Sequence, residues 1–427
     1  MAFKSISTDP AYKKDILKTV EWLKLILKEY GFAVEIWEGE ICNPIVYAKI
    51  SASVPRAKTV LVYGHYDVQP AEKRDGWTDE PFDLSVRKGK LFARGVVDNK
   101  GQNLTHIITV GELAKQGKLK YDVIFMIEGN EETANPEIPK IVERNKKKLK
   151  ANHIIISDGE IVGSTPTIEA SLRGGFNMTI KITTGVTNLH SGIFGGAIPS
   201  ASHELSRLLG SLYDEKGMVA IPNFYEAAPA ISSAMKKKNK SIQPEKDILK
   251  LAGVKALTPE KGLDFFSQTG LRPTIQVTGI KTGYIGEGYA NIVPAEAEAR
   301  INVRVAGRQK PEKIYRAIEA YFRKNTPKYA KLSISHTEWN DPVAIDVSTK
   351  EMRDVRAILK KAYGKEPIIK YVGGSIPIVS DFKKILGRDT MLVSLGNDDC
   401  NMHGLDENFT VDLVKKGLKF SELFFSK

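Results

Sequence analysis

The chain has 427 residues, a length that favours two domains over a single core. Its 42% hydrophobic and 27% charged residues are those of an ordinary globular protein, and two cysteines exclude a disulfide framework. The net charge of +12 comes mostly from dispersed lysine without interleaved aromatic residues, which argues against a nucleic-acid partner. The first residues lack the apolar core of a signal peptide, and no stretch approaches the roughly 18 apolar residues of a membrane span. We therefore expect a cytoplasmic protein without a membrane partner.

The N-terminal segment predicts an amphipathic helix, because Asp9 and Pro10 suit its cap and first position and apolar residues recur at helical spacing until Gly31. Helix-compatible segments follow at 101–116 and 136–149. Apolar runs bounded by glycine or polar residues predict buried strands at 59–64, 122–129, 153–159 and 390–396. Alternating strands and helices indicate an α/β fold with a doubly wound, mostly parallel sheet.

The pattern changes at about Ser171. Alternating strands are predicted at 176–184, 273–280 and 296–305, and helices at 200–213 and 311–324. The lysine-rich stretch 227–262 is weakly periodic, so we expect an irregular surface excursion there. After Asp341 the helix and strand pattern returns. Residues 1–170 and 341–427 are therefore expected to form a catalytic metal-binding domain, interrupted by a smaller α+β domain over 171–340.

A histidine and an aspartate follow the first predicted buried strand, in GHYDVQP. His65 and Asp67 are two residues apart in extended chain, so their side chains point to the same side. A metal-binding imidazole needs a partner for its second nitrogen, and Asp67 can supply one. On its own, the motif fits a histidine satisfied within a turn equally well.

Further acids and a second histidine follow the other predicted strands. Asp98 lies in a glycine-flanked loop, and its two carboxylate oxygens can bridge two metal ions. Glu131 and Glu132 diverge as neighbours, so one can bind a metal while the other holds a water. Asp158 follows the apolar part of its strand, 153–157, and His403 follows the strand 390–396. Each of these residues alone suits an ordinary solvated position better.

Their combination is more informative, because the carboxyl ends of strands in an open parallel sheet border the ligand crevice. Four predicted strands deliver histidine or acidic residues to that edge. Two histidines and several carboxylates match zinc, cobalt or manganese in a site with an open position for water. The pattern predicts a paired-metal hydrolase.

A series of motifs resembles the co-catalytic zinc metallopeptidases, a family that includes carnosine dipeptidase, cytosolic nonspecific dipeptidase, acetylornithine deacetylase and succinyl-diaminopimelate desuccinylase. The motifs are GHYDVQP, GVVDNKG, EGNEE, HSGIFGG and GGSIP, together with Asp158 and His403. They run in order from about Tyr63 to about His403, which is most of the chain. The HSG, FGG and GGSIP elements resemble the dipeptidase branch.

The resemblance implies two divalent metal ions, zinc before manganese or cobalt. The implied ligands are His65 and Asp158 for one ion, Glu132 and His403 for the other, and Asp98 between them. Glu131 is implied as the general base that takes a proton from the metal-bridging water and later delivers it to the leaving amine. Asp67 is implied to orient His65.

The interrupting domain of this family implies a lid and a dimerisation surface, and hence a homodimer. His190 in the HSG motif is implied to reach the partner subunit's active site and stabilise the oxyanion, with a polar residue in a glycine-rich turn as the less favoured alternative. Asn291 and Arg304 match substrate-binding positions, where a guanidinium suits the substrate's terminal carboxylate. Ser375 fits the same end of the substrate, and Gly374 beside it allows close approach.

The expected function is hydrolysis of a peptide bond next to a free carboxylate, by a dipeptidase or a carboxypeptidase. An N-acyl amino acid deacylase is the first alternative, because the metal ligands do not separate the two. A non-catalytic binding protein on the same fold is the second, and the presence of all five ligands and Glu131 argues against it. The contexts GEIVGSTPT after Asp158 and CNMHGLDEN around His403 match no single subfamily, so the choice of substrate stays open.

Overall fold

The computed structural model describes residues 1–258 and 260–427, which divide into two units. Unit 1 comprises Met1–Ala170, Ile345–Lys370 and Ile376–Lys427, and unit 2 comprises Ser171–Ala344 and Tyr371–Ser375. The chain therefore contributes to unit 2 twice, first through the long insertion and again through the short segment that holds Gly374 and Ser375.

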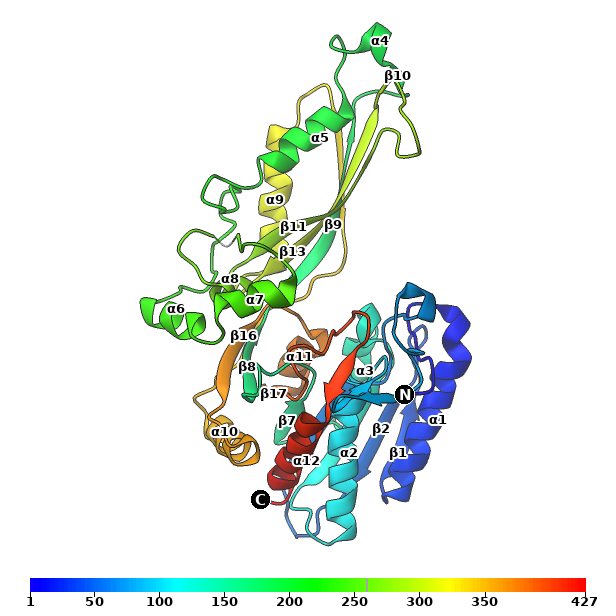
Figure 1. Ribbon diagram of the computed structural model, residues 1–427, viewed down its shortest axis with the longest axis vertical. Helices are drawn as coiled ribbons and strands as arrows, with labels where there is room; N and C mark the ends of the chain where they lie inside the picture. Colours follow the sequence, from blue (N-terminus) through cyan, green and yellow to red (C-terminus); the bar gives the residue numbers. More distant parts are fainter. Residues whose placement is uncertain (259) are drawn as a thin grey trace. The chain divides into compact units, whose positions relative to one another are not determined.

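Unit 1 contains most of a sheet of nine strands in the order β1-β2-β6-β3-β7-β17-β8-β15, with β16 beside β8 (Figure 1). The strands are β1 (Ala33–Trp37), β2 (Ile45–Ile50), β3 (Thr59–His65), β6 (Asp122–Glu128), β7 (His153–Ile156), β8 (Thr167–Leu172), β15 (Val343–Ala344), β16 (Ile368–Val372) and β17 (Thr390–Ser394). The neighbours β6, β3, β7 and β17 run parallel and are the four strands predicted from the apolar runs. The predicted α/β class with its mostly parallel centre is confirmed.

The flanking strands run antiparallel, which the sequence reasoning did not predict. β1 pairs with β2, β2 with β6, and β8 with β17 in antiparallel register. Residues 38–44 join β1 to β2. So short a connection can only reverse the chain, because a parallel crossover needs a dozen or more residues.

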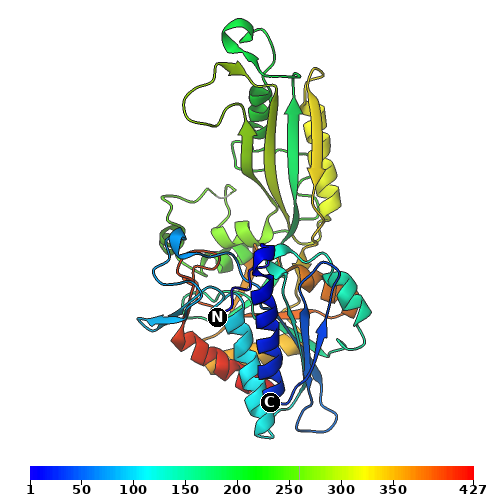
Figure 2. The same ribbon diagram turned by 90° about the vertical axis from the view of Figure 1, so that its right-hand side faces the viewer.

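Helices cover both faces of this sheet. α1 (Lys13–Glu29), α2 (Lys100–Lys115) and α12 (Val411–Phe425) lie on one face, and α3 (Ile138–Arg144) lies on the other (Figures 1 and 2). The predicted N-terminal helix is confirmed: a short 3-10 turn, η1 (Pro10–Tyr12), precedes α1, and the Asp9 side chain accepts a hydrogen bond from Ala11 N.

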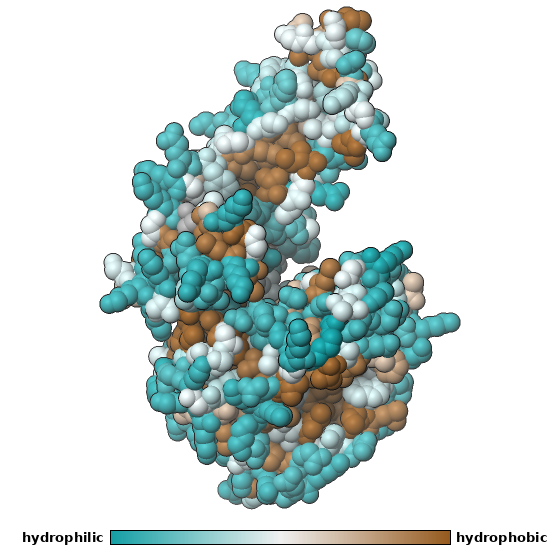
Figure 3. Space-filling view, in the orientation of Figure 1, coloured by the Kyte–Doolittle hydropathy of each residue, from teal (hydrophilic) through white to brown (hydrophobic). Residues whose placement is uncertain are grey.

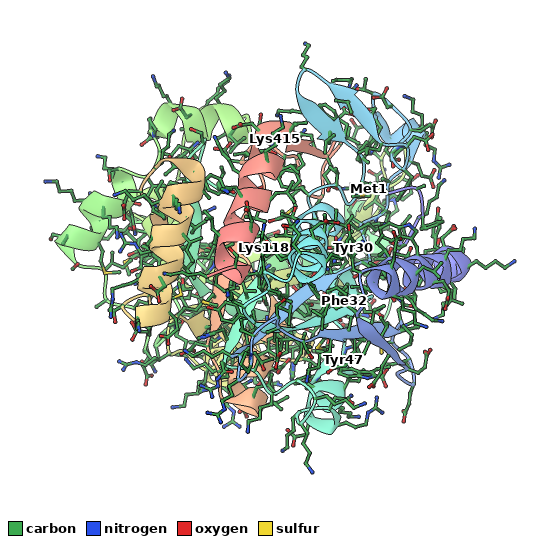
Figure 4. The ribbon with its side chains drawn as sticks, turned by 90° about the horizontal axis from the view of Figure 1, so that it is seen from below. Met1, Tyr30, Phe32, Tyr47, Lys118 and Lys415 are labelled. Carbon is green, nitrogen blue, oxygen red and sulfur yellow. The ribbon has the colours of Figure 1, made fainter. Side chains whose placement is uncertain are left out.

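Aromatic residues after α1 anchor that helix to its neighbours (Figure 4). Tyr30 packs on Gly111 of α2, where an added Cβ would lie 2.2 Å from the ring, so only glycine leaves room for this contact. The Lys115 ammonium lies 4.3 Å from the Tyr30 ring centroid. Phe32 meets Phe125 of β6 edge to face, with ring centroids 5.7 Å apart.

A buried histidine on α2 makes the stability of unit 1 sensitive to pH. His106 lies between Ser157 and Ser421, with nitrogen-to-hydroxyl distances of 2.9 and 3.1 Å, and burial lowers its pKa to about 4. The unfolded chain takes up this proton near pH 6.5. The folded pKa is lowered, so the stabilisation is complete above pH 6.5 and is lost as the pH falls towards 4.

As the pH falls from 7 to 5, we expect the titration of His106 to lower the free energy of unfolding by about 2 kcal/mol. In His106→Gln, the amide keeps a donor and an acceptor for the two serines but does not titrate. Urea unfolding at both pH values should therefore show a smaller loss in the variant. The same loss in both proteins would contradict this assignment.

Unit 2 is built on a four-stranded antiparallel sheet in the order β11-β13-β9-β14. The strands are β9 (Gly174–Thr183), β11 (Thr274–Thr282), β13 (Glu296–Val305) and β14 (Lys331–His336). α5 (Ala201–Gly210) and α9 (Pro311–Asn325) cover one face, where Leu208 and Ile318 join a core with Ile180 and Ile301 of the sheet (Figure 1). The predicted α+β character of the insertion is confirmed.

The lysine-rich stretch 227–262 is more regular than predicted. It contains α6 (Ser233–Lys240) and α7 (Glu245–Ala252), and α8 (Phe265–Leu271) follows it. Ser232 caps α6 by accepting a hydrogen bond from Met235 N, and Ile248 of α7 is buried. Each of the two helices has only eight residues, too few turns for a clear apolar period.

Smaller elements complete the two units. In unit 1 these are α10 (Lys350–Tyr363), α11 (Pro377–Asp381) and a sheet of β4 (Ser85–Arg87), β5 (Lys90–Phe92) and β18 (Asn408–Thr410). Unit 2 adds a ribbon of β10 (Leu189–His190) and β12 (Ile292–Val293), followed on the β10 side by α4 (Ser191–Phe194). Among the described residues, no helix combines the length and apolar character needed to cross a membrane.

Candidate active site

The predicted metal ligands of unit 1 all lie where its parallel strands end. His65 ends β3, Asp158 follows β7, and Glu132 lies in the short turn η3 (Glu131–Thr133) after β6. Asp98 precedes α2, and His403 lies in the loop between β17 and β18. This edge is where open α/β sheets bind their ligands.

The structure brings these five side chains into two adjoining groups that share Asp98. Asp98 Oδ1 lies 3.1 Å from His65 Nε2, and Asp98 Oδ2 lies 2.8 Å from His403 Nε2. His65 Nε2 is also 3.7 Å from Asp158 Oδ2, and His403 Nε2 is 3.2 Å from Glu132 Oε2. Within each group the possible ligand atoms all lie within 4.8 Å of one another. One carboxylate thus presents an oxygen to each histidine.

The donor set fits two divalent cations. The backbone carbonyl of Asp67 accepts from His65 Nδ1 at 3.0 Å, so the other nitrogen of a neutral His65 ring keeps a lone pair. That nitrogen, Nε2, is buried and has no hydrogen-bond partner among the described residues, although it faces Asp98 and Asp158. Several carboxylates buried together are costly unless cations compensate them. Imidazole nitrogens and carboxylate oxygens are the ligands that zinc, manganese and cobalt accept.

The pKa values show that this edge of unit 1 favours positive charge. Burial lowers the pKa of His65, but Asp158, Asp67 and Asp98 raise it well above its usual value. Hydrogen bonds with Asp98 and Glu132 raise the pKa of His403 to about 10. The carboxylates around both histidines thus create a site that stabilises positive charge, as a metal site requires.

Glu131 belongs to neither ligand group among the described residues. Burial raises the pKa of its carboxyl group well above the usual value, and Asp158, Asp67 and Glu132 raise it further. His65 opposes this effect. A carboxylate with a raised pKa next to a ligand cluster is suited to take up a proton.

Asp67 holds the histidine and the glutamates in place together. Its carboxylate accepts hydrogen bonds from the backbone N–H groups of Glu131 and Glu132, at 3.2 and 3.1 Å, and from Ser7 Oγ at 2.7 Å. The contact with His65 Nδ1 is shorter for the Asp67 carbonyl, at 3.0 Å, than for the carboxylate, at 3.4 Å. Asp67 therefore positions the glutamate turn as well as His65.

Two further residues that position the ligands were not predicted from the sequence. Gln69 Nε2 donates to Glu132 Oε2 at 2.7 Å, and Asn99 Nδ2 donates to Asp158 Oδ1 at 2.9 Å. Both lie within motifs that were singled out, Gln69 in GHYDVQP and Asn99 in GVVDNKG. Their place beside ligand residues was the only signal, because the residues that they contact are about 60 positions away.

In unit 2, the ribbon of β10 and β12 carries two of the predicted site residues. His190 is exposed, and its Nδ1 accepts a hydrogen bond from Gly192 N at 3.0 Å. An accepting Nδ1 is unprotonated, so Nε2 of the neutral ring carries the proton and can donate it. Asn291 lies beside it, and its backbone carbonyl accepts from Ser191 N at 2.9 Å.

The other predicted residues of unit 2 lie together at the end of β13. Arg304 Nη1 donates to Ser375 Oγ at 3.1 Å, and Arg304 Nε donates to Asn302 Oδ1 at 3.2 Å. Both acceptors are neutral, and burial lowers the pKa of Arg304. The Gly374 carbonyl accepts from the backbone N–H of Arg173 at 3.1 Å. Half-buried Arg304 thus has hydrogen-bonding capacity left for an anion.

A comparison with protein families decides the identity. The model of "Peptidase family M20/M25/M40" matches residues 61–427, which is most of the chain. The chain belongs to this family. It is therefore a hydrolase of a metallopeptidase family, and the resemblance inferred from the motifs is confirmed.

Individual relatives agree with this assignment. The chain is 30% identical to the cysteinylglycine-S-conjugate dipeptidase of Corynebacterium striatum over 400 residues, which cover 92% of this chain and 85% of the relative. It is 27% identical to the Beta-Ala-His dipeptidase of Rattus norvegicus, covering 90% and 79% of the two chains. Among solved structures, a metallo-carboxypeptidase of the M20 family from Sulfolobus solfataricus has a TM-score of 0.87 at 27% identity, covering 100% of this chain and 96% of that one.

Proposed function

We propose that this enzyme hydrolyses the peptide bond of dipeptides, next to a free carboxylate, with the help of two divalent metal ions. The observation that carries the proposal is the carboxylate of Asp98, which presents one oxygen to His65 and the other to His403. The dipeptidase relatives support the substrate class. Longer peptides are tested as well, because the chain is also similar to the carboxypeptidase of Sulfolobus solfataricus.

Two ligand groups would hold the ions: His65, Asp98 and Asp158 the first, and Asp98, Glu132 and His403 the second. Two bound ions supply Lewis acidity, which lowers the pKa of a water and polarises the scissile carbonyl group. Zinc, manganese and cobalt all accept nitrogen and carboxylate ligands. Of the three, zinc is the ion that we favour.

Glu131 is the general base in this proposal. Its carboxylate takes a proton from the attacking water and later gives it to the leaving amine. The raised pKa of Glu131 supports both steps, since a carboxylate with an ordinary pKa near 4 would hold the proton too weakly to deliver it. Asp67 keeps Glu131 in place through its backbone N–H group.

The substrate contacts that we propose come from unit 2. Arg304 binds the terminal carboxylate of the dipeptide, with Ser375 and Gly374 at the same end and Asn291 as a further contact. The support is that Arg304 and Ser375 are within hydrogen-bond distance of each other and that the acceptors of Arg304 are neutral. A bidentate guanidinium–carboxylate contact then selects a free carboxyl end over an internal peptide.

His190 stabilises the oxyanion of the tetrahedral intermediate in this proposal, and it does so in the active site of a partner subunit of a homodimer. The dimer would form through unit 2. Support comes from the end of unit 2 near α4 and β10, where exposed apolar side chains gather (Figure 3). These side chains are Val186, Ile193, Tyr284, Ile285 and Tyr289.

The test is metal-dependent hydrolysis across a substrate panel. The protein is stripped with a chelator, reloaded with zinc, manganese or cobalt, and assayed on dipeptides, longer peptides, and acetyl- and succinyl-amino acids. We expect no turnover without metal, and the highest kcat/KM on dipeptides after reloading. Blocking the carboxyl end of the best dipeptide as an amide should lower kcat/KM by at least about tenfold, because Arg304 then loses its charged partner.

The other outcomes of the panel are equally informative. Release of single residues from the carboxyl end of longer peptides would make the enzyme a carboxypeptidase. Preference for acylated amino acids would make it a deacylase, the alternative that the metal ligands alone do not separate. Absence of turnover on every substrate, with metal bound, would favour a non-catalytic binding protein.

A further inference from the structure

Two loops that are distant in sequence supply the ligands Asp98 and His403. The first loop, residues 93–98, leads into α2, and the second, residues 400–407, lies between β17 and β18. We refer to them as the Asp98 loop and the His403 loop. The backbone N–H of Ala93 donates to the carbonyl of Glu407 at 3.2 Å, so the two loops lie side by side.

A buried carboxylate of the His403 loop binds the backbone of the Asp98 loop. Glu407 has no solvent exposure. Its Oε1 accepts from the N–H groups of Val97 and Asp98, at 2.9 and 3.1 Å, and its Oε2 accepts from that of Gly95 at 2.9 Å. One side chain therefore satisfies three backbone donors, including the N–H of the ligand residue itself.

A buried arginine also binds Glu407. Arg94 of the Asp98 loop donates through Nη1 to Glu407 Oε2 at 2.8 Å and through Nη2 to the Gly404 carbonyl at 3.0 Å. Gly404 is the residue after His403. The Trp77 ring covers the guanidinium at 5.1 Å, and Arg94 is only 3% exposed. The guanidinium group of Arg94 thus binds the His403 loop through two hydrogen bonds.

The His403 loop needs such support, because its backbone is not held by regular structure. Asn401, His403 and Asp406 all have positive φ angles, of 54°, 59° and 53°, a conformation that is uncommon for residues other than glycine but that asparagine, histidine and aspartate adopt more often than most. The His403 side chain is itself 54% exposed, so packing does not fix its ring.

We propose that the buried Arg94–Glu407 pair positions the half of the metal site that contains His403. Glu407 binds the N–H of Asp98, and Arg94 binds the carbonyl of Gly404. The ion pair between the two side chains thereby sets the distance between Asp98 Oδ2 and His403 Nε2. Neither residue touches the reacting atoms, so both are positioning residues. This inference rests on the proposed two-metal function. It predicts that the affinity for the ion at His403 depends on the Arg94–Glu407 pair more strongly than the affinity for the ion at His65.

The half of the site that contains His65 has its own supports. His65 ends β3, which is paired on both sides, with β6 and β7. Asp158 is held by Asn99 Nδ2 at 2.9 Å. Asp98 is the only ligand that this half shares with the other among the described residues. Loss of the Arg94–Glu407 contact should therefore weaken the ion at His403 far more than the ion at His65.

The experiment is calorimetric titration of the chelator-stripped protein with Mn²⁺, which reads metal affinity without activity. The wild-type protein should bind two ions, and His403→Ala identifies the step that belongs to the His403 half. In Glu407→Gln, the amide nitrogen faces backbone donors that it cannot satisfy, so we expect that step to weaken by about 10- to 100-fold. The other step should change by less than about threefold.

Arg94→Lys is the second variant, because Glu407→Gln places an amide in a fully buried position. Lysine keeps the charge but cannot reach Glu407 and the Gly404 carbonyl with one fork, so the same step should weaken. Asp406→Asn is the matched control: it alters the neighbouring acid of the same loop, whose carboxylate accepts from Thr78 N and Thr78 Oγ1 and faces Arg87 Nη2 at 3.8 Å. Asparagine tolerates positive φ, and both ions should bind as in the wild-type protein.

Two results would overturn the inference: wild-type affinity for both ions in Arg94→Lys, or an equal loss of both steps in whichever of the two variants folds. Circular dichroism of the stripped proteins checks that folding. A wild-type protein that binds no ion would instead overturn the proposed function. The two failures are thus distinguishable.

Discussion

Glu131→Gln should abolish turnover while both metal ions stay bound. Glutamine cannot take a proton from the attacking water, and loss of a general base lowers kcat by about 10²- to 10⁴-fold. Glu131 belongs to neither ligand group in the described part of the chain, so the ions should keep their affinity. Its backbone N–H still donates to Asp67, which leaves the turn in place. Steady-state kinetics and metal content measured on the same preparation check both statements.

Glu132→Gln provides the matched control, since it makes the same chemical change one residue away. Glu132 Oε2 faces His403 Nε2 at 3.2 Å, so this variant should lose affinity for one ion. Its activity should recover in part when metal is added in excess, whereas that of Glu131→Gln should not. Turnover in Glu131→Gln within tenfold of the wild-type rate would exclude Glu131 as the base.

His190→Ala should lower kcat by about 10²- to 10³-fold, the usual cost of removing one oxyanion donor. Its Nδ1 accepts from Gly192 N, so Nε2–H is available to donate to charge that develops in the transition state. Because the side chain is exposed, the free energy of unfolding should change by less than about 0.5 kcal/mol. Kinetics and urea unfolding of the variant separate the two effects.

His203→Ala is the control for this prediction. His203 is an exposed histidine on α5 of the same unit, and its removal should leave both kcat and stability unchanged. A fall in KM and kcat together, or a large loss of stability in His190→Ala, would point to a structural role for the HSG turn. An unchanged kcat would remove His190 from the mechanism.

The sequence by itself determined the central strands and the residues that follow them. Apolar runs of strand length identified β3, β6, β7 and β17 because burial on both faces leaves few polar residues in a parallel strand. The polar residues just past these runs, His65 and Asp158 among them, could then be assigned to one edge, since parallel strands end together. Both inferences use only local pattern and the geometry of a sheet.

Only the tertiary structure decided how the residues of that edge support one another. The antiparallel direction of the flanking strands and the two eight-residue helices in 227–262 were likewise not predicted from the sequence. The contact between Arg94 and Glu407 joins residues 313 positions apart, and that between Gln69 and Glu132 spans 63. Hydrogen bonds of this kind depend on which loops the folded sheet brings together, and a single sequence carries no periodic signal for them. The candidate ligands are therefore visible in the motifs, while the contacts that hold them are visible only in the fold.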